Sequence, residues 1–469
     1  MAEAAPALPE QPGSTPPVRT HARARPRPRS MSDWIQLVAA TNAVVLVLNL
    51  LTGVVSARVM GPAGKGVFNA INVWTGVFTA LAGMGLPSAF ISAYSKASEE
   101  EHPGLARAAF SLSCFWGLLG TVAVYMLEPA LIGHMDPRAA AWARLSSPLV
   151  AVFVITGMGG AMISVQKRFG ALNWVTFART VLYAACVGGL ALWGVLNPYS
   201  QLSVSWLLLV ASSAMVVWVG VVGLPLRLGA IRWQALMDLS GLGLRYYSLG
   251  LLGMFNSQLD QMIASAWLSA RDMGLYAVAI SSLSVVGVLQ GAVSTVMFPM
   301  IAGDSREAVI ERTSRMVRRL MPLFVVLMVL VCASAWPVLL VLYGRVYLPA
   351  VSVVLLIAPT AALVSAIMIF YQAFYALRWF AGPTLGEGMG AASGAILLWV
   401  LIPRWGLQGA AVAATASYAL DLAVVVIYWC RASGMGIADL LTTREDLRYL
   451  ARELRTRLVL SRLLKGVSG

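Results

Sequence analysis

Long apolar runs govern what this chain can fold into. Twelve runs of about 20 residues or more are separated by short connections. They span 34–56, 67–93, 105–127, 143–165, 173–196, 203–226, 243–268, 274–300, 320–342, 350–372, 384–402 and 407–429. Only 12% of the residues are charged and 59% are hydrophobic, and the mean hydropathy is +0.77. Because about 20 apolar residues are needed to cross a bilayer as a helix, we expect an all-α polytopic membrane protein with about twelve transmembrane helices.

The distribution of basic residues predicts the orientation. The chain has a net charge of +14 and 34 Lys and Arg residues, five of them before residue 30 and eight from Arg431 onward. If both tails are cytoplasmic, the inner connections hold fourteen basic residues and the outer ones seven. Lys and Arg are retained on the cytoplasmic side, so both termini are expected there. No basic patch is interleaved with exposed aromatic residues, which argues against nucleic acid as a partner.

A weak internal repeat predicts two lobes. GKGVFNAI at 64–71 and DMGLYAVAI at 272–280 lie about 208 residues apart, and each follows an outer hairpin. Six spans separate the copies, so both keep the same orientation, as in transporters whose halves are related by an axis along the membrane normal. We expect six-helix lobes at 34–226 and 243–430, joined by a cytoplasmic linker at 227–242.

Both tails are basic. Residues 1–33 are rich in proline and arginine, and we expect a disordered cytoplasmic tail. In the tail 431–469, leucines recur at helical spacing beside arginines, which predicts an amphipathic helix. The leucines are Leu447, Leu450, Leu454 and Leu458, and the arginines are Arg448, Arg452 and Arg455. The basic connection 304–319 is also expected to form an amphipathic cytoplasmic helix.

Several separated segments together resemble one family. They are ARVMGPAGKGVFNAI at 57–71, ALAGMGLPSAFI at 80–91, LDQMIASAWLSARDMGLYAVAI at 259–280, MFPMIAG at 297–303 and IPRWGLQGAAVAATASYAL at 402–420. In order and spacing they resemble the polysaccharide-export flippases, the Wzx-type members of the multidrug/oligosaccharidyl-lipid/polysaccharide (MOP) exporter superfamily. The similarity covers about residues 34–430.

The resemblance implies a MATE-like fold in which two six-helix lobes enclose a central cavity that opens alternately to the two membrane faces. It implies a bacterial inner-membrane protein that flips an undecaprenyl-diphosphate-linked oligosaccharide to the outer leaflet. Implied partners are this lipid-linked cargo, membrane lipids, a polysaccharide polymerase and glycosyltransferases. Relatives often carry an acid near Gly83 and a basic residue near Ser92, whereas both positions are uncharged here.

Polar side chains inside the spans are the candidate cavity residues, because a charge at mid-membrane costs about 2.5–3.5 kcal/mol and therefore usually faces a cavity. These candidates are Asn42, Asn49, Asn69, Asn72, Arg179, Arg245, Asn256, Asp260 and Gln261. Asp260 has two interpretations: it lines the cavity and takes part in proton or sodium coupling, or it bonds locally to Arg271 or to backbone. For Asp421, structural pairing is favoured. For the amides, hydrogen bonding between helices explains the pattern at least as well as sugar binding does.

The outer hairpin carries Arg58 and Lys65. Arginine suits a diphosphate because its planar fork donates two parallel hydrogen bonds. For Arg58 and Arg245 the favoured alternative is that the side chain reaches the membrane interface. Gly83, Gly85 and Pro87 interrupt the second span, and we expect a helix bend there that is used in alternating access.

Other classes of function have little support. The four cysteines and three histidines are scattered, so neither a metal site nor a cofactor is expected beyond a coupling ion. No catalytic constellation is predicted, and we expect a transporter rather than an enzyme. One alternative is a multidrug or cation antiporter of the same superfamily. A second is a membrane glycan polymerase or ligase, which generally needs a larger outer loop than this chain has.

Overall fold

The structure is a computed structural model that describes residues 31–222, 233–301, 303–448 and 452. The chain divides into two units, residues 1–44 and 45–469. None of the described residues lies in a β-strand.

The described chain is a succession of α-helices. They are α1 (Met31–Gly83), α2 (Leu86–Tyr94), α3 (His102–Ile132), α4 (Ala139–Ser146), α5 (Pro148–Val165), α6 (Phe169–Leu192), α7 (Pro198–Val222), α8 (Trp233–Trp267), α9 (Ala270–Ile301), α10 (Arg306–Val338), α11 (Ala350–Ile357), α12 (Pro359–Leu377) and α13 (Ala381–Ser433). A π-helix, η1 (Leu339–Tyr343), continues α10, and short 3₁₀ segments follow as η2 (Arg345–Tyr347) and η3 (Ile437–Leu440).

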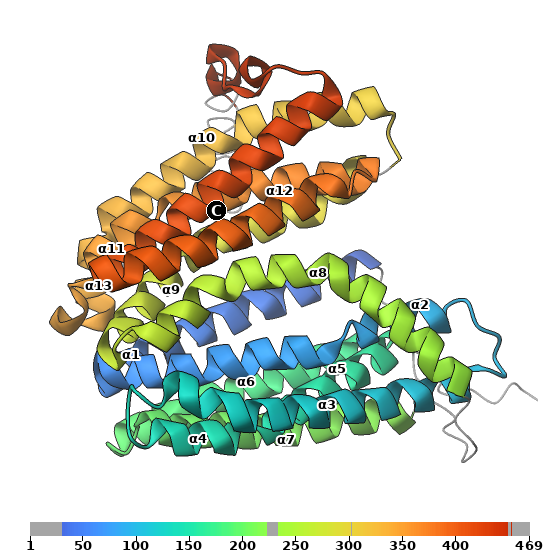
Figure 1. Cartoon of the computed structure of the whole chain (residues 1–469), viewed down its shortest axis with the longest axis vertical. Helices are drawn as coiled ribbons and strands as arrows, with labels where there is room; N and C mark the ends of the chain where they lie inside the picture. Colours follow the sequence, from blue (N-terminus) through green and yellow to red (C-terminus); the bar gives the residue numbers. More distant parts are fainter. Residues whose placement is uncertain (1–30, 223–232, 302, 449–451, 453–469) are drawn as a thin grey trace, which may run out of the picture. The chain divides into compact units, whose positions relative to one another are not determined.

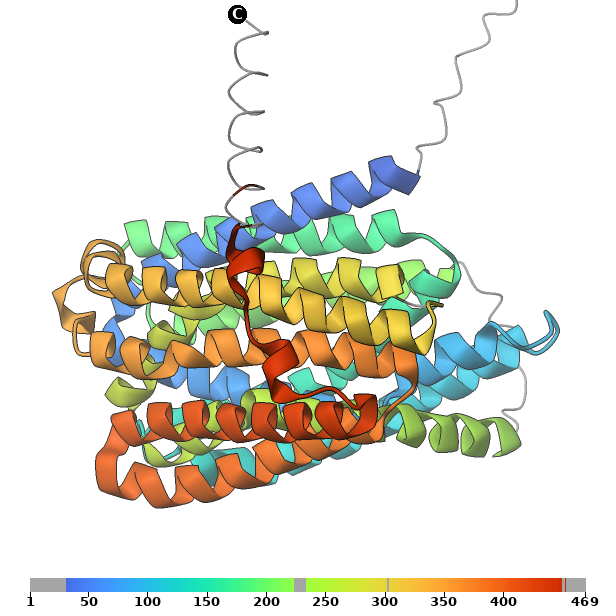
Figure 2. The same cartoon turned by 90° about the horizontal axis from the view of Figure 1, so that it is seen from above.

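Two of the helices each contain two membrane passes. α1 is interrupted at Gly61 (φ 67°, ψ 178°) and α13 at Gly406 (φ 55°, ψ −129°), where a non-helical glycine lets the chain turn back. The two halves of α13 run side by side in both views (Figures 1 and 2). Eight helical segments are long and apolar enough to cross a membrane. Two of these segments contain the paired passes of α1 and α13. Helices α8 and α9 cover the two remaining predicted spans.

The helices form two groups within residues 45–448. We call 45–222 the N-terminal lobe and 233–448 the C-terminal lobe. In Figure 1, α3–α7 lie on one side and α10–α13 on the other, with α8 between them. α8 contacts α13 in its own lobe and α2 and α3 in the other, so it joins the two groups.

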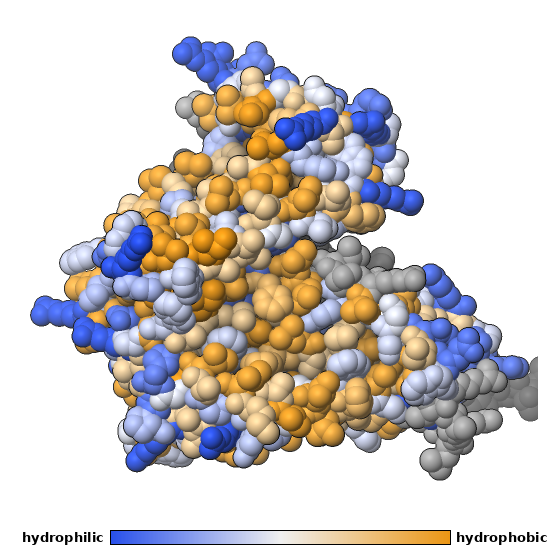
Figure 3. All heavy atoms as spheres, in the orientation of Figure 1, coloured by the Kyte–Doolittle hydropathy of each residue, from blue (hydrophilic) through white to orange (hydrophobic). Residues whose placement is uncertain are grey.

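Each lobe has its own apolar core. In the N-terminal lobe Ile71 and Trp74 pack with Leu202, and in the C-terminal lobe Phe370 and Phe374 pack around Trp429. Large apolar side chains are also exposed, such as Leu118 at 63%. In Figure 3 apolar side chains cover much of the middle of the face, while hydrophilic ones gather toward its edges. This distribution is what a lipid-facing surface requires.

Several predicted boundaries shift. Residues 233–242, predicted as a linker, form the first turns of α8, and residues 223–232 lie outside the described part of the chain. Helix α1 begins at Met31, inside the predicted tail, whose residues 1–30 are not described. The helix expected at 304–319 is not separate, because α10 runs unbroken from Arg306 into the ninth span. Most of the predicted C-terminal amphipathic helix, including Leu450, Leu454, Leu458 and Arg455, also lies outside the described residues.

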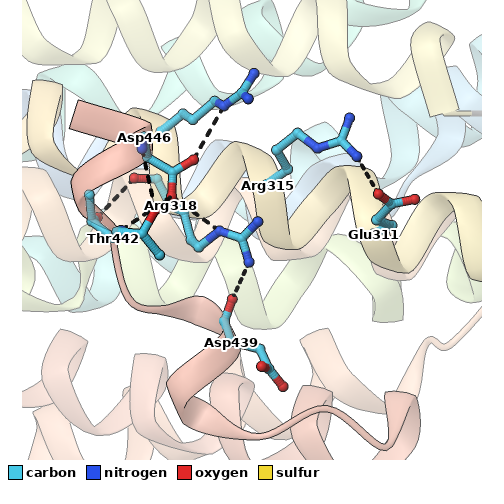
Figure 4. Close-up of polar contacts among 8 residues, drawn as sticks. Glu311, Arg315, Arg318, Asp439, Thr442 and Asp446 are labelled. Carbon is cyan, nitrogen blue, oxygen red and sulfur yellow. Dashed lines mark hydrogen bonds and ion pairs between the residues drawn. The ribbon is translucent and has the colours of Figure 1, made fainter. Parts of the chain in front are cut away.

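A segment after α13, residues 434–448, is tied to the first turns of α10 (Figure 4). Arg318 donates to the Asp439 carbonyl oxygen at 2.8 Å, and Thr442 donates to the Arg318 carbonyl oxygen at 2.8 Å. Arg318 and Arg319 each lie 3.4 Å from Asp446. Desolvation by burial works to raise the pKa of Asp446, but hydrogen bonds from Thr443 and Arg319 and the Arg318 charge hold that pKa below its ordinary value.

Candidate functional site

A buried polar cluster joins three helices of the C-terminal lobe. Asn256 on α8 donates from Nδ2 to Glu387 Oε2 at 2.9 Å and to Asp421 Oδ2 at 3.1 Å. Glu387 belongs to the first half of α13 and Asp421 to the second half. Tyr371 on α12 donates to Asp421 Oδ1 at 3.4 Å. We call Asn256, Tyr371, Glu387 and Asp421 the acid cluster.

Glycines make this close approach of helices possible. A Cβ on Gly386 would lie 2.5 Å from Asp421 Oδ1, and one on Gly390 would lie 3.0 Å from Asn256 Nδ2. On α8, a Cβ at Gly253 would lie 3.1 Å from Glu387 Oε1. Small residues let helix backbones approach closely in membranes, so these positions bring the amide and both carboxyl groups within hydrogen-bonding reach of one another.

The acid cluster contains negative groups without a basic partner. Among the described residues, the ion pairs lie elsewhere and involve Arg312, Arg315, Arg318 and Arg319. Asp421 is 1% exposed and Asn256 is 7% exposed. Burying an unpaired carboxylate costs far more than a hydrogen bond returns. Asp421 and the partly exposed Glu387 share one amide, and the pair is therefore stable when a proton or a bound cation neutralises charge between them.

One turn further along α8 lies a second polar group. Asp260 accepts a hydrogen bond from Tyr276 of α9 at 2.8 Å, rather than from Arg271. Asp260, Gln261 and Gln290 line a cavity of about 160 Å³ together with Tyr418. Tyr418 also lies within 3.4 Å of the Asn256 carbonyl oxygen, to which it donates. The cavity is therefore one hydrogen bond away from the acid cluster.

Two predicted candidates meet across the lobes. Asn69 of α1 donates from Nδ2 to Gln261 Oε1 at 3.3 Å. Asn256 and Asp260 lie one turn apart on α8, as their i,i+4 spacing predicted, and Gln261 follows Asp260 directly. The structure thus brings four of the predicted polar residues into one continuous polar region: Asn69, Asn256, Asp260 and Gln261.

The cations of the first hairpin have different surroundings. Arg58 is exposed and donates to the carbonyl oxygens of Val341 and Leu342 at the end of η1. Lys65 is partly buried, with its Nζ 5.3 Å from the centre of the Phe68 ring. Lys65 and Asn49 line a second cavity of about 190 Å³ with Ser281 and Ser284 of α9. The lysine thus places a positive charge beside three neutral polar groups.

The remaining predicted cavity residues are Asn42, Asn72, Arg179 and Arg245. Asn72 donates to the Phe68 carbonyl oxygen of its own helix. Arg179 is on α6, which packs against α5 and α7. Asn42 is exposed in the first unit of the chain, and the side chain of Arg245 lies outside the described part.

The predicted bend in the second span is present as a helix break. Gly83 ends α1, Met84 (φ 45°) and Gly85 (φ 64°) are left-handed, and Pro87 opens α2. A Cβ on Gly85 would lie 2.5 Å from the Gly243 carbonyl oxygen of α8, whereas one on Gly83 would meet nothing within 4 Å. Gly85, and not Gly83, is therefore required by both backbone conformation and space.

Sequence reasoning missed three residues. Glu387 is a single acid near the start of a span, where a charge is ordinary. Tyr371 resembles any aromatic core residue. Glu128 of α3 is 0% exposed and accepts a hydrogen bond from Ser146 at 3.0 Å, while its Oε1 has no partner among the described residues. The signal available for the two acids was their position within or directly beside a predicted span: Glu387 lies in 384–402, and Glu128 follows 105–127.

The match to a protein family settles the family of this chain. Residues 55–352 match the family described as Polysaccharide biosynthesis protein. The chain belongs to this family. A comparison with curated proteins finds no match.

Solved structures share its fold. "Lipid II flippase MurJ, inward closed conformation" superposes with a TM-score of 0.72 at 14% identity, over 91% of this chain and 92% of the other. An inward-facing multidrug resistance MATE family transporter of the MOP superfamily follows with a TM-score of 0.67 at 13% identity, over 83% and 94%. A MOP superfamily transporter from Pyrococcus furiosus gives 0.58 at 11% identity, over 86% and 94%.

These matches bear on the predictions. The shared fold confirms the predicted all-α, MATE-like class of membrane protein. The family match and the shared fold agree with the predicted resemblance to the flippases of the MOP superfamily. The roles of individual residues stay predictions.

Proposed function

We propose that this protein flips a lipid-linked oligosaccharide from the cytoplasmic to the outer leaflet of a bacterial inner membrane by alternating access. Its family, described by polysaccharide biosynthesis, supports a glycan cargo. The fold that it shares with a lipid II flippase supports a cargo attached to lipid. Such a cargo needs a polar path for its headgroup while its lipid chain stays in hydrocarbon.

The acid cluster carries the proposal that transport is driven by an ion. Glu387 and Asp421 share the Asn256 amide and have no basic partner among the described residues. Gain or loss of a proton or Na⁺ therefore changes the net charge at the point where α8, α12 and α13 meet. A ligand shifts a conformational equilibrium by its difference in affinity for the two states, and a buried charge supplies such a difference.

The Lys65 cavity supports the recognition of an anionic headgroup. Lys65 lines a cavity between α1 and α9 together with Asn49, Ser281 and Ser284. An ammonium group with neutral hydrogen-bonding neighbours suits a diphosphate. Arg58 is already engaged by the carbonyl oxygens of η1, so we assign the headgroup to Lys65 in this state of the protein.

Purified protein in proteoliposomes provides the test. Undecaprenyl-diphosphate-linked oligosaccharide is placed in one leaflet, and its appearance in the other is followed under a pH gradient, a Na⁺ gradient or neither. One gradient should accelerate translocation at least about tenfold, and Asp421→Asn should abolish that acceleration. Glu307→Gln, at an exposed acid of α10, is the matched control.

The result also separates the alternatives. Gradient-driven efflux of small cationic drugs, with no movement of the lipid-linked cargo, would replace this proposal by a multidrug antiporter. Covalent extension of the glycan by the purified protein would replace it by a polymerase or ligase. In cells, deletion should make the lipid-linked unit accumulate in the cytoplasmic leaflet, and a reporter fused after Arg431 should be active only in the cytoplasm.

A further inference from the structure

Two glycines from different lobes touch each other's helices where the hairpins turn. Gly66 follows the turn of α1, and Gly274 lies in the first turns of α9. A Cβ on Gly66 would overlap the Ala270 carbonyl oxygen, and a Cβ on Gly274 would overlap the Pro62 carbonyl oxygen. Neither glycine has a positive φ. Space alone, and not backbone conformation, therefore requires glycine at these two positions.

The contact is reciprocal in the register of the internal repeat. Gly66 meets the residue four before Gly274, and Gly274 meets the residue four before Gly66. Gly66 corresponds to Gly274, and Pro62 corresponds to Ala270. Both correspondences have the spacing of about 208 residues that relates GKGVFNAI to DMGLYAVAI. The two lobes thus present the same small surface to each other, as at a two-fold interface. We call this the glycine contact.

Further contacts between the lobes surround the glycine contact. Tyr347 donates to the Ala57 carbonyl oxygen at 2.9 Å, and His134 Nε2 lies 3.1 Å from the Leu268 carbonyl oxygen. Arg58 donates to the carbonyl oxygens that end η1. In these contacts every acceptor is a backbone carbonyl oxygen, whereas Asn69 and Gln261 meet through their side chains. All of these contacts form only when the helices of the two lobes are close.

We propose that Gly66 and Gly274 form the closed gate at the hairpin end of the transporter. This inference rests on the proposed function only for the identity of the cargo that passes the gate. Because the contact joins the lobes themselves, the hairpin end opens when these two helices separate. A methyl group at either glycine occupies the place of a carbonyl oxygen, so it prevents closure while leaving each lobe intact.

Thiol labelling of purified protein in lipid nanodiscs tests this gate without any cargo. In a background in which Cys114, Cys186, Cys332 and Cys430 are replaced by serine, Ala57→Cys places a reporter at a position that is 0% exposed beside the contact. Ala63→Cys, at an exposed position of the same hairpin, reports total reactive protein. A polar maleimide is the probe.

Gly66→Ala and Gly274→Ala should each accelerate labelling at position 57 at least about tenfold, because overpacking opposes the closed state. The double variant should add little, since one methyl group already holds the contact open. Gly76→Ala is the matched control, because Gly76 lies on the same helix with no heavy atom within 4 Å. Labelling at position 57 that stays slow in both single variants, with normal labelling at position 63, overturns the proposal.

A second variant covers the case in which the alanine variants fold poorly. Tyr347→Phe removes the hydrogen bond to the Ala57 carbonyl oxygen without adding any atom near the glycines. It should accelerate labelling at position 57 by about twofold to fivefold, since one hydrogen bond is lost; no change would count against the gate. Altered labelling together with an absence of lipid-linked cargo transport in proteoliposomes refutes the proposed function and leaves the gate standing.

Discussion

Each lobe buries a carboxyl group within its helix packing, but the two groups are held differently. In the C-terminal lobe Asp421 is 1% exposed and is bound by Asn256 of α8 and Tyr371 of α12, with Glu387 on the same amide. In the N-terminal lobe Glu128 is 0% exposed and accepts a hydrogen bond from Ser146 alone among the residues that the structure describes. Thr75 of α1 in turn donates to Ser146 Oγ at 3.2 Å.

The difference indicates which acid can act as a switch. A single buried carboxyl group with one hydrogen-bond donor has its lowest free energy when it is protonated. It then stays protonated and does not exchange a proton or a cation during transport. A pair of carboxyl groups that share an amide has two charge states of similar free energy. Because the pair contacts three helices, a change of charge state alters the packing of all three. We therefore propose that ion coupling belongs to the C-terminal lobe and that Glu128 has a structural role.

The largest effect is expected from neutralising the acid cluster. Asp421→Asn or Glu387→Gln should reduce gradient-driven transport at least about tenfold, because the exchangeable charge is gone. Stability should be unchanged or higher by about 1 kcal/mol, since a buried ionisable group is replaced by a neutral one of similar size. Transport in proteoliposomes and thermal unfolding in detergent measure the two quantities. Loss of both together would indicate that the cluster is structural.

A smaller effect is expected from crowding the same cluster. Gly386→Ala should destabilise the protein by about 1–3 kcal/mol, because the new methyl group meets the Asp421 carboxylate. Gly388→Ala is its control two residues away on the same helix, with nothing within 4 Å of the added atom. Equal thermal unfolding midpoints for the two variants would contradict the packing described here.

Neutralising the N-terminal acid Glu128 should leave gradient-driven transport intact, unlike neutralising Asp421. Glu128→Gln should change stability by less than about 1.5 kcal/mol, because the amide is isosteric with a protonated acid, and it should leave gradient-driven transport intact. Ser146→Ala should cost about 1–3 kcal/mol, since it removes the hydrogen bond that Ser146 donates to a buried carboxyl group. If Glu128→Gln abolishes ion coupling, then the comparison fails and both lobes carry a coupling site.

The smallest effect is expected at Asp446, an acid that does have basic partners. Its folded-state pKa is lowered, so its contribution to docking of residues 434–448 is present above the ordinary pKa of an aspartate. That contribution is lost as the pH falls through the lowered pKa. We expect about 1 kcal/mol or less, the usual size for a pair near the surface. Proteolysis of this segment as a function of pH measures it, and Asp446→Asn should remove the pH dependence.

The sequence predicted the helical passes well because crossing a membrane is a local requirement. Each apolar run must satisfy its own backbone hydrogen bonds within one helix, so its length and composition suffice to locate it. The break at Gly85 was visible for the same reason, since glycine and proline act on the backbone where they stand. Linker residues 233–242 were misplaced because packing of α8 on α2 and α3 extends a helix that the local sequence does not demand.

By itself the sequence therefore determined the passes, the repeat and the polar character of α8. Only the tertiary structure decided that Asn256, Glu387 and Asp421, which are up to 165 residues apart, share their hydrogen bonds. It also decided that the two glycines of the repeat press against each other's helices. The physical reason is that helix propensity and hydropathy act within a few turns of one helix. The role of a buried acid or of a glycine depends instead on the atoms of the helix that packs against it.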